Sequence, residues 1–208
     1  MLYLTMRHFL SLLLLLFATT SFCQRDEIYN LAFSDTSNFK LTTYLNHKQP
    51  VKIFIIDTTG TWRKERFWLN ELDKESTHAI KQMQSDEHHP YNHTFLFKDT
   101  TLDRLISDNE KKALREKAGA FTPKKIVLKG KNYVTVSSSK NLKGFYFVTT
   151  EPVFTNDTRY AFIDMVVFYK DKLKQDLNGT YFGTICIVYE KQPDNTWKKI
   201  KVRNYLIL

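Results

Sequence analysis

The segment Tyr160–Tyr169 constrains the fold most strongly, because it is apolar on both faces of a strand. Its even-numbered and odd-numbered positions are both rich in Phe, Ile, Val and Met, and Asp164 is the exception. A strand with one face in water alternates apolar and polar residues, whereas a strand buried on both faces does not. The sequence therefore predicts a strand that is covered on both sides by helices and by aromatic residues from the first half of the chain.

The second half of the chain, from Lys125 onward, follows a period of two in several segments that turn residues separate. Asn178-Gly179 and Pro193–Asn195 are typical of tight turns. Neighbouring strands joined by short turns most simply form an antiparallel meander. We therefore expect strands at Ile126–Val136, Phe145–Thr150, Tyr160–Tyr169, Tyr181–Glu190 and Thr196–Ile207.

The first half of the chain mixes one strand with helices. Val51–Asp57 reads as a buried strand, and apolar residues at helical spacing predict an amphipathic helix over Asp73–Gln84. A second helix is expected to begin at Ser107, where Ser107–Glu110 has the form of a capping box, and to end before Pro123. The sequence thus predicts an α+β fold, with an antiparallel meander sheet in the C-terminal half packed against helices of the N-terminal half.

Residues 1–23 have the parts of a secretory signal peptide in the required order. Arg7 supplies a positive start, and the apolar run Phe9–Ala18 is followed by small residues. That run is shorter than the roughly 20 apolar residues that span a bilayer. We expect the signal to be removed, so that residues 24–208 form a single α+β domain that is periplasmic or secreted and has no transmembrane segment.

The two cysteines of the chain, Cys23 and Cys186, cannot form a disulfide after that cleavage. Cleavage between Cys23 and Gln24 is the preferred interpretation. Lipid attachment through Cys23 is the alternative, and it is disfavoured because Phe22 stands where a small residue is needed. Cys186 lies in an apolar strand pattern, so we expect a buried thiol that packs as a small apolar side chain.

Positive charge is concentrated in one part of the chain. The net charge is +9, and Lys111–Lys143 contains ten basic residues against one acid, Glu116. The rest of the expected mature chain is nearly neutral. Such a segment predicts either a solubilising face, with lysines that deter aggregation at a sheet edge, or a binding face. The candidate binding residues are Lys111, Lys112, Arg115, Lys117, Lys124, Lys125, Lys129 and Lys131.

The leading functional hypothesis is a non-enzymatic exported domain that binds an envelope component or a partner protein through this basic face. An anionic envelope surface or an acidic protein would complement its charge. Nucleic acid is a poorer match, because aromatic residues are not interleaved with the basic ones for base stacking. An immunity or structural protein that caps another protein is an alternative. We expect no cofactor.

An envelope hydrolase of the phosphoester type is the alternative from a different class. The apolar strand that ends in Asp57-Thr58-Thr59-Gly60 resembles the phosphorylated-aspartate loop of P-type ATPases and related phosphatases. Thr59 occupies the position at which soluble phosphatases of that kind place a second Asp. Asp164, in the middle of an apolar strand, would be costly to bury unless it is paired. It could serve in acid–base chemistry, but a structural ion pair or hydrogen bond is the preferred interpretation.

Three histidines, His88, His89 and His93, lie close together and are weak candidates for a zinc or copper site. Pro90 and Asn92 indicate a loop there, and the histidines lack the i, i+4 spacing of a helical metal motif. A solvated polar loop is therefore the preferred interpretation, and we predict no metal site.

The layout of the second half is similar to that of a family of exported Bacteroidota proteins of unassigned activity. Three stretches carry the resemblance: a helix with Asp73-Lys74-Glu75 and Lys81-Gln82-Met83, a strand entry at Thr150–Asp157, and a closing strand at Asn195–Ile200. Relatives often have a hairpin rich in Gly and Cys where this chain has Asp171–Gly179. The resemblance implies export and an α+β fold, and it implies no activity.

Overall fold

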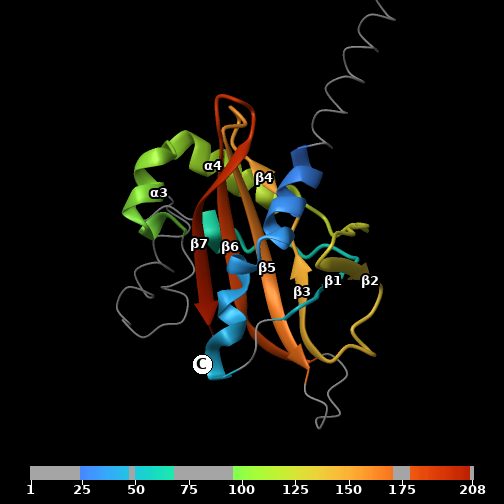
Figure 1. Ribbon diagram of the computed structural model, residues 1–208. Coiled ribbons are helices and arrows are strands. Elements are labelled where there is room, and N and C mark those ends of the chain that lie inside the picture. Colours follow the sequence, from blue (N-terminus) through green and yellow to red (C-terminus); the bar gives the residue numbers. More distant parts are fainter. Residues whose placement is uncertain (1–23, 47–49, 68–95, 171–178, 207–208) are drawn as a thin grey trace, which may run out of the picture.

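The computed structural model describes residues 24–46, 50–67, 96–170 and 179–206. These residues form a mixed sheet of seven strands with helices on both of its faces (Figure 1). The α+β class is as predicted. The expected signal peptide, the expected helix Asp73–Gln84 and the histidines His88, His89 and His93 all lie outside the described residues.

Strand β5, Tyr160–Lys170, lies inside the sheet and pairs antiparallel with a strand on each side. Four of the five strands that the period of two predicts are present, and they pair antiparallel with one another as expected. Both faces of β5 are buried, because Phe162 on one face and Ile163 on the other are fully covered. The strands in this part are β3 (Gly144–Thr149), β5, β6 (Thr180–Lys191), β7 (Trp197–Leu206) and the short β4 (Val153–Phe154), which also pairs with β5.

The prediction of a purely antiparallel meander is wrong, because a strand from the first half is inserted into the sheet. Strand β1, Ile53–Ile56, lies between β3 and β2 and runs parallel to both of them. The sheet order is β2-β1-β3-β5-β6-β7. Rules for neighbouring strands could not foresee this, since β1 is far from β2 and β3 in the chain. The apolar side chains of β1 favour burial in the sheet interior. A buried strand needs a partner strand on each side, because its main-chain N–H and C=O groups must form hydrogen bonds there.

The predicted strand Ile126–Val136 is interrupted by a turn, and only β2, Tyr133–Val136, remains as a strand. Residues 125–129 run antiparallel beside β2 and meet it at an isolated bridge between Lys129 and Val134. The turn requires glycine at Gly130, because a Cβ atom there would lie 2.2 Å from a carbon of the Tyr133 ring. The turn at Gly130 divides the predicted strand into the edge segment and β2.

Helical segments lie over both faces of the sheet (Figure 1), and each face has its own apolar cluster. The helix at residues 24–34 and the following η1 supply Phe33 and Phe39 to one cluster. The helices on the opposite face supply Leu102 and Leu114 to the other. Cys186 belongs to this second cluster and is fully buried, as predicted. The helical segments are η1 (Thr36–Asn46), η2 (Lys64–Phe67), η4 (Leu96–Lys98), α3 (Thr100–Leu105) and α4 (Asp108–Ala120).

Helix α4 begins as the sequence predicts, and this generates a test of the cap. The Ser107 hydroxyl accepts a hydrogen bond of 3.3 Å from the backbone N–H of Glu110. We expect Ser107→Ala to lower the free energy of unfolding by about 1 kcal/mol, because that N–H loses its acceptor. Urea denaturation followed by circular dichroism measures the change. Ser137→Ala, at an exposed serine, is the control and should stay within about 0.5 kcal/mol of wild type. Equal stability of the two variants would contradict the cap.

Candidate functional site

Lys111, Lys117 and Lys124, among the eight predicted basic residues, are held by short contacts inside the protein. Lys117 donates a hydrogen bond of 2.9 Å to the backbone oxygen of Phe154. Lys124 forms an ion pair with the buried carboxylate of Glu151, and Lys111 forms two ion pairs. These three side chains therefore have structural partners. Lys112, Lys125, Lys129 and Lys131 are exposed, and Lys125 lies 3.6 Å from the Asp57 carboxylate.

Lys111 connects the two helices of the basic segment. Its side chain is only 4% exposed, and its amino group lies 2.6 Å from Asp103 of α3 and 2.9 Å from Asp108 of α4. Burial lowers the pKa of this amine, but the hydrogen bonds and charges of the two carboxylates outweigh that effect and raise the pKa above its ordinary value. Lys111 is therefore a charged cross-link between α3 and α4 and is not available to a partner.

Glu151 is a second buried charge that sequence reasoning missed. It is 2% exposed, and its carboxylate lies 2.5 Å from the Arg25 guanidinium and also contacts Lys124. Its backbone oxygen accepts a hydrogen bond of 2.8 Å from the Trp62 indole. The contacts tie the helix at residues 24–34 to the sheet. No local pattern marks Glu151, because its partners come from positions far away in the chain.

One part of the basic segment, residues 125–131, lies along the edge of the sheet beside β2. Residues 125–131 alternate: Ile126 and Leu128 pack against the first apolar cluster, while the odd-numbered residues face solvent. Val127, between two lysines, is 83% exposed. The alternation places Lys125 and Lys129 on one side of an edge segment, and Lys131 is exposed in the turn that follows.

Two more lysines lie at the same end of the sheet as Lys129 and Lys131. Because β1 is parallel to both β2 and β3, the residues that precede the three strands meet at the same end. Lys131 precedes β2, Lys52 precedes β1, and Lys143 precedes β3. We call Lys52, Lys125, Lys129, Lys131 and Lys143 the lysine face. Lys125 lies farther along the edge than the other four, beside Asp57 and Thr58, which follow β1. Lys52 was missed in the sequence because it lies outside the basic segment, and only the parallel pairing of β1 brings it there.

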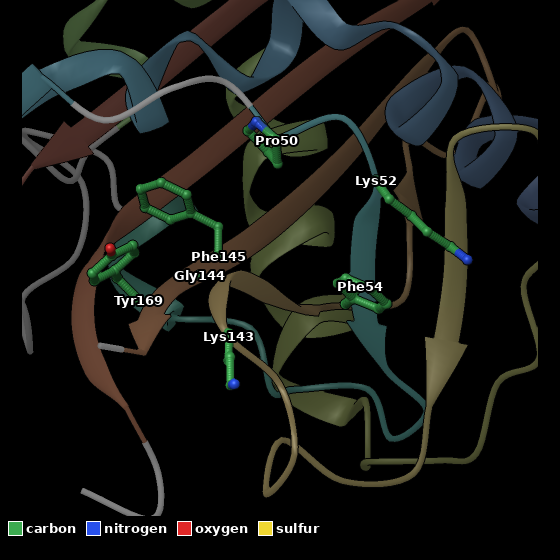
Figure 2. A pocket seen from close by; sticks show the side chains of 7 residues that line it. All are labelled: Pro50, Lys52, Phe54, Lys143, Gly144, Phe145 and Tyr169. Atoms are coloured by element: carbon green, nitrogen blue, oxygen red, sulfur yellow. The ribbon is translucent and has the colours of Figure 1, made fainter. Parts of the chain in front are cut away.

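A pocket of about 250 Å³ opens at this end of the sheet (Figure 2). The rings of Phe145 and Tyr169 lie on one side of it and the Phe54 ring on the other. The Lys52 amino group lies 5.8 Å from the centre of the Phe54 ring. None of the described residues that line the pocket is acidic, so its lysines have no counter-charge there. The lining residues are Pro50, Lys52, Phe54, Lys143, Gly144, Phe145 and Tyr169.

The turn after β1 does not offer the amides that a phosphoryl group would need. The backbone N–H of Thr59 donates to the Lys124 oxygen at 2.9 Å, and that of Gly60 donates to the Thr149 oxygen at 2.8 Å. Both donors are therefore used by carbonyl groups of the protein. Asp57 itself is partly buried and lies 3.6 Å from the Lys125 amino group. This arrangement anchors the turn to the sheet edge and gives no support to a phosphate-binding loop.

Asp164 is buried and paired, as the sequence favoured, but its partner comes from η2. The carboxylate is 2% exposed and accepts a hydrogen bond of 3.0 Å from Nε of Arg66, which is fully buried. The guanidinium lies 3.9 Å from the centre of the Tyr205 ring, which favours a cation–π contact. Nothing in the sequence around Arg66 distinguishes it from an exposed arginine. Its burial is decided by the packing of η2 on the sheet.

Burial dominates the protonation of the groups around Asp164. It raises the pKa of the Asp164 carboxyl above its ordinary value, although the Arg66 charge and hydrogen bond act in the opposite direction. Burial also raises the pKa of the Cys186 thiol, which lies opposite Asp164 in the register of β5 and β6. A substrate could reach this group only if the apolar core opened. The contacts support a structural role for Asp164.

The described part of the chain contains no cluster of three or more His, Cys, Asp or Glu residues that could hold a metal ion. Within the same ranges, no helix combines the length and the apolar character needed to cross a bilayer. The histidines His88, His89 and His93 lie outside them.

Comparison with known proteins adds no relative to this description. No protein-family model, no curated protein and no solved structure matches the chain significantly. The candidate site therefore depends on the geometry of the lysine face alone.

The buried ion pair yields a prediction for stability and its dependence on pH. Arg66→Met leaves the Asp164 carboxylate buried without its cation, so we expect a loss of about 3–5 kcal/mol at pH 7. In the folded state burial raises the pKa of Asp164 above that of the unfolded chain. The folded variant then binds a proton more strongly than the unfolded one, and its stability should increase from about pH 7 to about pH 5.

The matched control is Arg66→Met/Asp164→Asn, which carries no charge at either position. We expect it to be more stable than the single variant at pH 7 and to lack the additional gain at pH 5. Urea denaturation at both pH values, followed by tryptophan fluorescence, measures these differences. A single variant with the same pH dependence as the double variant would contradict the buried pair.

Proposed function

We propose that this protein is a non-enzymatic binding domain that holds an anionic partner against the lysine face. The observation that supports the proposal best is that five lysines from three separate segments lie along one edge of the sheet, and four of them, all except Lys125, lie at the end where β1, β2 and β3 begin. Among them only Lys125 has an ion pair with a described residue, and that contact, with Asp57, is 3.6 Å long. Isolated exposed lysines are ordinary, but unneutralised ones gathered from distant segments create a local positive potential.

The contrast with the other basic residues strengthens this interpretation. Where the protein uses a lysine structurally, as at Lys111 and Lys124, it supplies a carboxylate at ion-pairing distance. It supplies none for Lys52, Lys129, Lys131 and Lys143 within the described residues. Like charges held close together repel each other, so leaving them unneutralised favours a role in which an external anion completes the site.

The expected signal peptide places the domain outside the cytoplasm, in the periplasm or secreted, where an envelope component or an acidic protein would be the partner. Export and the resemblance to Bacteroidota exported proteins both stay predictions from the sequence. The enzymatic alternatives gain no support, since Asp57 lies in a turn whose amides are already used and Asp164 is enclosed in the core.

A charge-reversal experiment tests the proposal. Lys129→Glu/Lys131→Glu should weaken binding of the mature domain to polyglutamate, or to vesicles that contain anionic lipid, by at least about tenfold at low salt. Lys40→Glu/Lys198→Glu changes the net charge equally at two exposed lysines elsewhere, and it should retain most of the binding. Wild-type binding should be lost by about 0.5 M salt, where screening is nearly complete.

Microscale thermophoresis with polyglutamate and co-sedimentation with vesicles give the two dissociation curves, and they show which class of anion is preferred. Equal weakening by both double variants would mean that net charge alone is responsible. If the wild-type domain bound neither polyglutamate nor the anionic vesicles, the proposed function would be overturned.

A further inference from the structure

In the edge segment beside β2, residues 125–129, only every second residue forms main-chain hydrogen bonds with the sheet. The backbone N–H of Ile126 donates to the Asp57 oxygen at 2.7 Å. Leu128 accepts a hydrogen bond of 2.9 Å from the N–H of Thr135, and its own N–H donates to the Thr135 hydroxyl at 3.2 Å. Successive main-chain groups of an extended segment point to opposite edges. The inward edge is therefore satisfied by the even-numbered residues.

The outward edge belongs to Lys125, Val127 and Lys129. No described group accepts a hydrogen bond from the N–H of any of the three. The isolated bridges of Lys125 to Thr58 and of Lys129 to Val134 agree with this, because the hydrogen bonds at each bridge are made by the flanking residues. The side chains of these three residues are also exposed to solvent, on one face of the segment. A short strip at the edge therefore offers free main-chain groups together with the side chains of Lys, Val and Lys.

We propose that this strip, residues 125–129, binds an extended acidic segment of a partner protein by β-strand addition. An added strand would form main-chain hydrogen bonds with Lys125, Val127 and Lys129. Its alternate side chains would then lie beside theirs, on the same face. The two lysines favour an acid beside each of them, and Val127 favours an apolar residue between the two acids. The partner should therefore have an acid, an apolar residue and an acid at alternate positions. The structure thus specifies a five-residue pattern and not only a general attraction between opposite charges.

A second copy of this chain is a poor occupant of the same edge. Antiparallel pairing of two such strips would place lysines opposite lysines, and like charges directly across a strand pair are destabilising. Lysines on an open edge also deter unspecific strand pairing. The same residues can therefore reject most strands and accept an acidic one, which is how a specific site excludes wrong partners.

The inference rests on the proposed function, because it describes how the lysine face would engage one class of anionic partner. Its distinctive element is the main-chain hydrogen bonding, which electrostatic attraction alone does not need. The test therefore separates the two by removing hydrogen bonds while the charges are kept.

The probe is a short capped peptide in which glutamate, valine and glutamate alternate with threonine. We expect it to bind and to protect the amide hydrogens of Val127 and Lys129 from exchange, as measured by nuclear magnetic resonance. The same peptide with N-methyl groups on its edge-facing amides keeps its charges but should bind at least about tenfold more weakly. A scrambled peptide with adjacent glutamates should also bind more weakly and give no protection.

A matched pair of variants examines the same edge from the side of the protein. Val127→Pro removes the outward N–H and leaves the inward hydrogen bonds of Ile126 and Leu128. An edge strand tolerates proline at such a position, because the lost N–H has no partner in the sheet. We expect it to lose the peptide while retaining binding to polyglutamate. Val127→Thr keeps the N–H and should bind the peptide with an affinity within about threefold of wild type.

Equal affinity for the methylated and unmethylated peptides would overturn strand addition and leave the proposed function intact. If the wild-type protein bound neither the peptides, nor polyglutamate, nor the anionic vesicles, both the strand addition and the proposed function would be overturned. If Val127→Pro does not fold, the two peptides still decide the question with wild-type protein.

Discussion

The burial of both faces of β5 is the constraint on which the rest of the structure depends. A strand that is apolar on both sides must have a layer on each face and a strand at each edge. The protein meets the first need with the helix at 24–34 and η1 on one face, and with α3, α4 and the short helices on the other. It meets the second with β3 and β6. The two apolar clusters follow from this one strand.

The same arrangement explains why buried charges appear where they do. Asp164 lies on the face of β5 that the second layer covers, so its carboxylate is removed from water and needs Arg66 from η2. Glu151 lies between the sheet and the first helix and has Arg25 and Lys124 as partners. In each case the acid lies in or beside the sheet and its partner comes from outside it. The ion pairs fix the positions of the outer segments.

The insertion of β1 links the fold to the candidate site. Parallel pairing with β2 and β3 brings the starts of three strands together, and with them Lys52, Lys131 and Lys143. It also moves β2 and residues 125–129 to the outer edge, where no described strand covers them. A purely antiparallel meander would have distributed these lysines differently. The open basic edge is thus a consequence of where one early strand is placed.

The sequence by itself determined the local features of this protein, because they depend on near neighbours in the chain. The two-sided strand, the Ser107 cap, the buried Cys186 and the concentration of lysines after residue 111 are all examples. The tertiary structure alone decided which of those lysines are neutralised and that Lys52 joins them. It also decided that Arg66 is buried, because each of these depends on partners far away in the chain. Periodicity records which residues avoid water, but it does not record which distant segment will cover them.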